Sequence, residues 1–329
     1  MFSAFRSLRW AKLLPVVGVV ALLLPLSARV ARAEPGNAIQ RDGLAPRDSQ
    51  HHSWNLVDGR YSQVASTVSE PPEVTDAREG TRGACPAGMV QVIGEMKLNP
   101  SSSPHSWANV EQRQLETCTD WVSRKWPYVC RAFDRESWLQ TAARLKTRPL
   151  GFCIDRFEYP NRRGQFPLVQ VTWVEAEALC QKEGKRLCGE DEWTFACEGE
   201  EAMPYPYGYT RQDETCVIDK RTRKVHADQL TPRGSERSRR ELDRLWQGEA
   251  SGNRSGCRSS FGVYDLTGNV DEWTRSARPG ERPSILKGGY WGPGRNSCRP
   301  STRVHFEHFA YYQQGFRCCA DLPEAVVQR

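Results

Sequence analysis

The stretch Phe261–Trp273, FGVYDLTGNVDEW, joins an apolar run to a tight turn with a carboxylate on either side. The turn falls at residues 267–269, where glycine tolerates backbone angles that other residues avoid. Asp265 precedes the turn and Glu272 follows it. Carboxylates and freed backbone carbonyls are the oxygen ligands that calcium prefers. The stretch is therefore compatible with a calcium-binding loop or with a polar turn whose acids are solvated.

The first 33 residues contain the three parts of a secretory signal peptide. Basic residues precede the apolar run Leu13–Leu26, and the run is followed by a small-residue cleavage motif, Ala31-Arg32-Ala33. The run is short and contains two prolines, so it spans a bilayer poorly. No later segment is long and apolar enough to span a membrane. We therefore expect an exported protein, periplasmic or extracellular, with residues 34–84 as a disordered polar leader.

The charge and size of the chain narrow its possible partners. The 329 residues are 38% hydrophobic, which is enough for a full core. The formal net charge is +6, and it falls to +1 without the five basic residues of the signal peptide. A mature chain this close to neutral does not indicate a nucleic-acid partner.

Twelve cysteines, an even number with no Cys-x-x-Cys pair, indicate disulfides rather than a zinc site in an exported chain. Cys118 with Cys130 and Cys216 with Cys257 are plausible local bridges. Spacing alone does not assign a partner to any of the others.

Local signals predict several elements. A first strand is expected in residues 85–94, a helix in 106–124 and a strand in 167–171. A capping box formed by Thr172 and Glu175 predicts a helix that ends at Gly184, and a second helix is expected from 190 to 197 after Gly189. A charged insertion at 220–256 predicts one exposed helix, at 235–247. The other expected insertion covers 99–149.

Four segments of the chain occur in the order found in the formylglycine-generating enzyme family. They are Gly151–Pro160, Thr172–Cys197, Phe261–Trp273 and Gly315–Asp321. The chain therefore resembles a sulfatase-modifying-factor domain over residues 85–325. The resemblance implies an α+β, C-type-lectin-like fold with little regular secondary structure and many disulfides. It also implies the bridges Cys180–Cys318 and Cys197–Cys298, and a structural calcium held by Asp265, Glu272 and the carbonyls of Gly268 and Val270.

The chain departs from this family where the chemistry should be. The family converts a cysteine of a sulfatase to formylglycine with copper held by two thiolates just before the cysteine matched by Cys298. Soft thiolates suit Cu(I), but residues 289–297 contain no cysteine. Tyr290, Asp271 and Gln313 replace a serine, a tryptophan and an asparagine of the family. Copper is therefore not expected, and ordinary formylglycine formation is not predicted.

Two functional hypotheses remain. The first is a binding module or pseudoenzyme that takes a protein, glycan or small-molecule ligand at a site lined by Asp271, Tyr290, Trp291, Arg295, His305 and Gln313. The second is a divergent oxidoreductase that binds another transition metal, with Asp271, His305, Glu307 and His308 as the candidate residues. In a third possibility, a free Cys188 or Cys319 supplies a thiol to the site.

Overall fold

The computed structural model describes residues 54–57, 60–63, 85–100, 109–125, 128–276, 278 and 280–322. The predicted signal peptide lies outside the described residues, as does most of the predicted leader. Within the leader, β1 (Trp54–Val57) and β2 (Arg60–Gln63) pair as antiparallel strands. These two strands are the part of the predicted leader that the structure describes.

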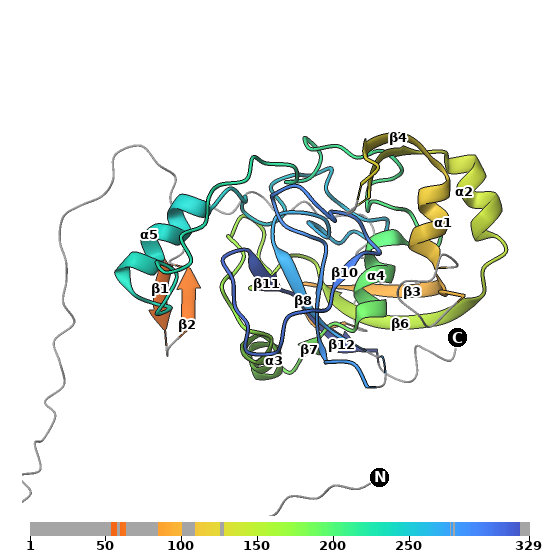
Figure 1. The fold of residues 1–329 in the computed structure, drawn as a ribbon. Helices are drawn as coiled ribbons and strands as arrows, with labels where there is room; N and C mark the ends of the chain where they lie inside the picture. The colour runs from red at the N-terminus through yellow and green to blue at the C-terminus, as the bar shows by residue number, and fades with distance from the viewer. Residues whose placement is uncertain are drawn as a thin grey trace, which may run out of the picture. The chain divides into compact units, whose positions relative to one another are not determined.

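One sheet joins the beginning, the middle and the end of the domain (Figure 1). Its strand order is β3 (Met89–Lys97), β6 (Thr147–Asp155), β12 (Cys318–Asp321) and β7 (Arg186–Leu187). All of its pairings are antiparallel, and β3 and β6 pair over their full nine residues. The C-terminal strand is therefore clamped between two earlier segments.

A second sheet holds the central turn and the residues on which the functional hypotheses rest. Its order is β10 (Ser301–Thr302), β9 (Ser284–Lys287), β8 (Asp271–Arg275) and β11 (Gln314–Phe316). Strands β8 and β11 are parallel, and Gln314 pairs with Asp271. This pairing brings the end of the Phe261–Trp273 stretch beside residues that lie more than forty positions later.

The helices with clear capping signals form where the sequence predicts them. Helix α3 (Trp173–Lys182) has Thr172 as its N-cap and a complete capping box with Glu175. Helix α4 (Glu190–Glu198) follows Gly189, and three acidic residues occupy its first turn. The other helices are α1 (Val110–Glu116), α2 (Arg135–Ala142) and α5 (Glu236–Leu245).

Two local predictions are wrong. The helix expected at 106–124 ends at Glu116, because residues Cys118–Ser123 form β4, which pairs with β5 (Val129–Phe133). The bridge between Cys118 and Cys130 closes this hairpin. Residues 167–171 do not form a strand; they run without regular structure beside β11, where the Leu168 carbonyl lies next to Gly315.

All twelve cysteines are bonded in six disulfides. Both bridges implied by the family resemblance are present, Cys180–Cys318 and Cys197–Cys298, as are the two local bridges Cys118–Cys130 and Cys216–Cys257. The two pairs that the sequence left open are Cys85–Cys153 and Cys188–Cys319. The hypothesis of a free thiol at Cys188 or Cys319 is therefore wrong, because these two residues bond each other.

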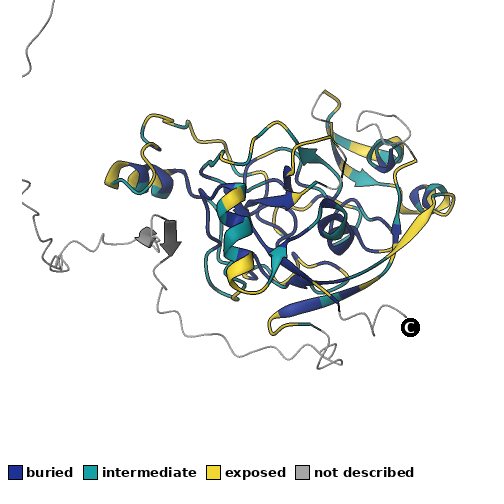
Figure 2. Cartoon of the chain, turned by 90° about the horizontal axis from the view of Figure 1, so that it is seen from below, coloured by how far each residue is buried: buried dark blue, intermediate teal, exposed yellow. Residues whose placement is uncertain are grey.

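The buried residues gather along the inner strands, α4 and the loops between them (Figure 2). One hydrophobic cluster contains Trp246, Trp273 and Trp291, and a second contains Trp193 and Phe195 of α4. Helix α5 is half-buried rather than exposed, since Leu242 and Leu245 pack into the first cluster. Among the described residues, the longest helices have ten residues and none could cross a membrane.

Candidate functional site

The central turn has the strained geometry that its glycine suggests. Asp265, Gly268 and Asn269 all have positive φ angles, of 58°, 81° and 51°. A Cβ atom on Gly268 would lie 2.3 Å from the carbonyl oxygen of Val217, so only glycine fits there. The turn is thus packed tightly against the backbone of Val217.

Glu158 holds the turn from beneath, a role that the sequence reasoning missed. Its carboxylate accepts hydrogen bonds from the side-chain amide of Asn269, the hydroxyl of Ser251 and the backbone N–H of Val270. Glu158 lies within the segment Gly151–Pro160 that carries the family resemblance. The presence of a carboxylate in that segment is the sequence feature from which this role could have been predicted.

Three carboxylates and one guanidinium are buried together around the turn. Glu158, Asp265, Glu272 and Arg317 are each at most 3% exposed. Arg317 donates to both oxygens of Glu272 at 2.7 Å, and the Trp193 indole donates to Oε2 of Glu272 at 2.8 Å. Three acids face one base, so a formal charge of about −2 stays uncompensated if all are ionised.

The pKa values of two of the turn acids are raised, chiefly by burial. Burial, followed by the neighbouring Asp265 and Glu272, raises the pKa of Glu158 well above its usual value. Burial raises the pKa of Asp265 to about 7. Both shifts arise first from burial, which disfavours the ionised forms of these carboxyls.

The predicted calcium ligands fit a hard divalent cation in donor type and in charge. Asp265 gives one oxygen to the Gly252 N–H, and its carboxylate lies close enough to Glu272 for repulsion. Glu272 is shared, since Arg317 and Trp193 already bind its oxygens. The carbonyls of Gly268 and Val270 belong to the same turn, so a cation here would be held by Asp265, Glu272 and main-chain oxygens.

A second group of polar side chains surrounds Asp271 at the start of β8. Arg295 donates to Oδ2 of Asp271, and the backbone N–H of Asp271 donates to the carbonyl of Gln313 at 2.9 Å. Gln314 pairs with Asp271 in the sheet and is fully buried. The structure thus brings together Asp271, Arg295 and Gln313 of the predicted ligand site and adds Gln314.

Several polar atoms of this group have no partner among the described residues. They are Oδ1 of Asp271, Oε1 of Gln313, and both Oε1 and Nε2 of Gln314. Unsatisfied polar atoms of this kind are costly, at about 1–3 kcal/mol each. All four atoms are enclosed, and Gln314 and Asp271 are paired in the sheet, so an enclosed water or a ligand that displaces the covering side chains would complete their hydrogen bonding.

Aromatic side chains continue from this polar group to the surface. The His305 ring stacks on Phe309 with 4.1 Å between centroids, and Phe309, Tyr311, Tyr312 and Tyr290 follow in successive ring contacts of 4.8–6.3 Å. Tyr290 and Tyr311 are half-buried. Part of each ring is therefore accessible to a ligand.

Trp291, predicted as a pocket residue, lies in the core. It is 1% exposed and contacts the rings of Trp246 and Tyr312. Its backbone N–H donates to the carbonyl of Asn269, and its carbonyl accepts from the N–H of Lys220. These two hydrogen bonds hold the residue inside the core. Trp291 therefore supports the aromatic group from behind.

The candidate metal ligands around His305 do not form a group that could hold a transition metal. Within the described ranges, no group of three or more His, Cys, Asp or Glu side chains could hold a metal ion, so a cation in the central turn would depend on two carboxylates and main-chain oxygens. His308 is exposed, and the Glu307 carboxylate accepts from the Ser284 hydroxyl. His305 does lie near Asp271: burial lowers its pKa, and the Asp271 charge opposes that shift.

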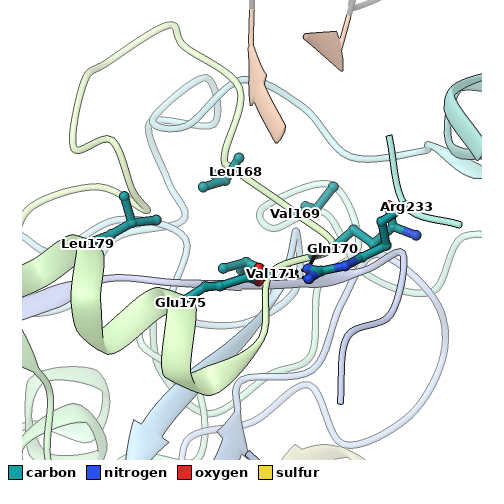
Figure 3. A pocket seen from close by; sticks show the side chains of 7 residues that line it. All are labelled: Leu168, Val169, Gln170, Val171, Glu175, Leu179 and Arg233. Atoms are coloured by element: carbon teal, nitrogen blue, oxygen red, sulfur yellow. Dashed lines mark hydrogen bonds and ion pairs between the residues drawn. The ribbon is translucent and has the colours of Figure 1, made fainter. Parts of the chain in front are cut away.

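A pocket lies elsewhere, between residues 168–171, helix α3 and the charged insertion (Figure 3). Its lining is Leu168, Val169, Gln170, Val171, Glu175, Leu179 and Arg233. Arg233 binds both oxygens of Glu175 at 2.7 Å and donates to the carbonyl of Gln170. None of the predicted ligand-site residues lines this pocket, and its charged groups anchor the insertion to α3.

Comparison with protein families matches residues 106–322 to the sulfatase-modifying factor enzyme 1-like domain. The inactive C-alpha-formylglycine-generating enzyme 2 of Bos taurus is 31% identical over 165 residues, covering 47% of this chain and 50% of that protein. The formylglycine-generating enzyme of Bos taurus is 25% identical over 197 residues, covering 48% of this chain and 45% of that protein. The chain thus spans about half the length of the curated relatives it matches.

Among solved structures, PvdO from Pseudomonas aeruginosa is similar, with a TM-score of 0.40 and 16% identity. The likeness covers 71% of this chain and 94% of that chain.

Proposed function

Because the chain belongs to the sulfatase-modifying factor enzyme 1-like family, we propose that it uses this domain as a binding module and not for thiol-dependent oxidation. All twelve cysteines are in disulfides. A disulfide sulfur has no thiolate to offer to Cu(I). Similarity to relatives named as inactive supports the same proposal.

The proposed ligand site of this module is the polar group around Asp271 together with the aromatic side chains that begin at His305. The observation that carries the proposal is the set of unpaired polar atoms on Asp271, Gln313 and Gln314. A ligand with both donors and acceptors, such as a glycan, a peptide or a small polar molecule, would satisfy them. Tyr290 and Tyr311 would add apolar contact.

Replacing Gln314 with methionine separates binding from stability. Methionine has nearly the same shape as glutamine and lacks the two buried unpaired atoms. We therefore expect the free energy of unfolding to rise by about 1–3 kcal/mol, and the melting temperature to rise with it. The same change should weaken ligand binding at least tenfold. Differential scanning fluorimetry and a glycan and peptide array, each run on wild type and Gln314→Met, measure the two effects.

Gln114 provides the matched control. It is also a buried glutamine, but its amide donates to the carbonyl of Ala202 at 2.6 Å. Gln114→Met should therefore destabilise the domain and leave array binding unchanged. The proposal fails if Gln314→Met destabilises as much as Gln114→Met, or if the protein with copper and oxygen converts the cysteine of a sulfatase peptide to formylglycine.

We also propose that calcium occupies the central turn as a structural ion. The three buried carboxylates of the turn face only one positive charge, that of Arg317. A Ca²⁺ ion bound there would interact with the folded state and not with the unfolded chain, so it would stabilise the fold. At 100 times its dissociation constant, it should add about 2.7 kcal/mol of stability. Chelation should lower the melting temperature, Ca²⁺ should restore it, and Asp265→Asn should abolish the difference. Elemental analysis of the purified protein that found no calcium would contradict this.

The six disulfides support folding in an oxidising environment. Within that limit, we propose a role in the periplasm or at the outer surface of the cell, with the predicted signal peptide directing export.

A further inference from the structure

The charged insertion concentrates the positive charge of the chain. Residues 220–247 contain nine Arg or Lys residues and four Asp or Glu residues, a net charge of +5 against +6 for the whole chain. Charge gathered on one exposed segment creates a local field that attracts anions.

The basic residues of α5 form a row. Arg237, Arg240 and Arg244 occur at spacings of three and four residues, so they lie along one side of the helix over about 10 Å. All three are exposed, and the Arg240 side chain is 68% exposed. On the opposite side, Leu242 and Leu245 are buried in the core, as the buried and exposed sides of α5 show in Figure 2.

The segment at 221–224 extends this row. Arg223 donates to the carbonyls of Arg244 and Trp246, and Arg244 donates in return to the carbonyl of Lys224. The two segments are thus fixed side by side. Together their exposed cations form a surface that we call the basic face: Arg221, Arg223, Lys224, Arg237, Arg240 and Arg244.

Much of the charge on the basic face is not neutralised within the protein. Arg240 pairs with Glu236 and Arg244 pairs with Glu241. Within the described part of the chain, Arg221, Arg223, Lys224 and Arg237 have no carboxylate partner at salt-bridge distance, although Arg237 donates to the carbonyl of Thr231. Ser235 caps the helix and Ser238 donates to the carbonyl of Leu230, which ties the first turn of α5 to the residues before it.

We propose that the basic face binds a linear acidic polysaccharide. Three arginines of α5 lie in a row along the helix, with Arg223 at its C-terminal end, which suits an extended chain with repeated anionic groups. Five of the six cations of the basic face are arginines, and guanidinium groups bind carboxylate or sulfate oxygens in pairs. This proposal does not depend on the ligand site around Asp271, because it uses none of that site's residues.

An anionic membrane is the competing occupant, and the residues of the face argue against it. None of the exposed large hydrophobic residues of the domain falls within 220–247; those found in the described residues are Ile93, Val122, Tyr128, Val174, Val304 and Phe306. Surface helices that bind bilayers insert apolar side chains. The apolar side of α5 is already used in the core.

The test compares two triple variants of the full protein. Arg221→Gln/Arg237→Gln/Arg240→Gln removes three charges from the basic face, and Lys125→Gln/Arg144→Gln/Lys146→Gln removes three exposed charges from the 99–149 insertion. The probes are heparin, polygalacturonate, neutral dextran, and vesicles with 30 mol% phosphatidylglycerol. Affinity is measured over a series of salt concentrations, and thermal unfolding checks both variants.

We expect wild type and the control triple to bind heparin or polygalacturonate but not dextran. The basic-face triple should bind at least tenfold more weakly at 150 mM salt, with a shallower dependence on salt. A preference for heparin identifies sulfate, and equal binding of polygalacturonate identifies carboxylate, as the recognised group. Equal losses in the two triples, or binding to the vesicles without binding to either polysaccharide, would overturn the proposal.

Discussion

Replacing Arg317 with methionine is expected to destabilise the domain by about 3–5 kcal/mol, the usual effect of removing one partner of a buried ion pair. Arg317 is fully buried and donates to both oxygens of Glu272 and to the carbonyl of Tyr264. Without it, Glu158, Asp265 and Glu272 form a buried acidic group with no facing base. Urea unfolding monitored by tryptophan fluorescence measures the loss.

The matched control is Arg148→Met, which breaks the exposed pair of Arg148 with Asp191. Both side chains of that pair are at least 40% exposed, so its loss should cost about 0–1 kcal/mol. If Arg317→Met does not fold, the double variant Arg317→Met/Glu272→Leu removes the orphaned charge and should recover part of the stability. Equal losses in Arg317→Met and Arg148→Met would contradict the argument.

Local hydrogen-bond signals explain what the sequence could predict. Helix α3 was predicted from Thr172 and Glu175 because a capping box is complete within four residues. The helix at 106–124 was extended too far, because the pairing of β4 with β5 competes with it and cannot be seen from residues 106–124 alone. Hydrogen bonds between residues close in sequence can thus be predicted from the sequence, whereas the pairing of β4 with β5 cannot.

The candidate site shows the same limit. The sequence predicts some of the neighbours of Asp271 but not Gln314. Gln314 lies beside Asp271 only because β11 and β8 pair as parallel strands. Arg317 was also missed as the counter-charge to Glu272, although it lies in a quoted motif, because the contact spans 45 positions. Trp291 was placed in the site from its position in the chain, whereas contacts from both sides bury it.

Removing the bridge Cys180–Cys318 should cost far less than its sequence separation suggests. Its cysteines are 138 residues apart, and a loop of that size closed in isolation contributes about 5 kcal/mol in the chain-entropy model. Cys188–Cys319 closes nearly the same loop, however. While that bridge is intact, the other closes a ring of only roughly ten residues, which contributes about 3 kcal/mol.

The local bridge Cys118–Cys130, with a separation of 12, also contributes about 3 kcal/mol in this model. Cys180→Ala/Cys318→Ala and Cys118→Ala/Cys130→Ala should therefore cost about the same in non-reducing urea unfolding. A loss of about 5 kcal/mol for Cys180→Ala/Cys318→Ala would show that the neighbouring bridge does not share its loop.

Removing both long bridges tests the sharing directly. Once Cys180–Cys318 is gone, Cys188–Cys319 closes a ring of roughly thirty residues, because Cys197–Cys298 still bridges the rest of the long loop. The second removal should then cost slightly more than the first, about 3.5 kcal/mol, for a combined loss of about 6 kcal/mol. Two independent loops would give about 10 kcal/mol, so the combined loss distinguishes nested from independent bridges. Nesting of this kind means that three disulfides tie β7, α3 and α4 to the C-terminal half, and losing any one leaves the segment that carries Asp271 and Gln314 still enclosed.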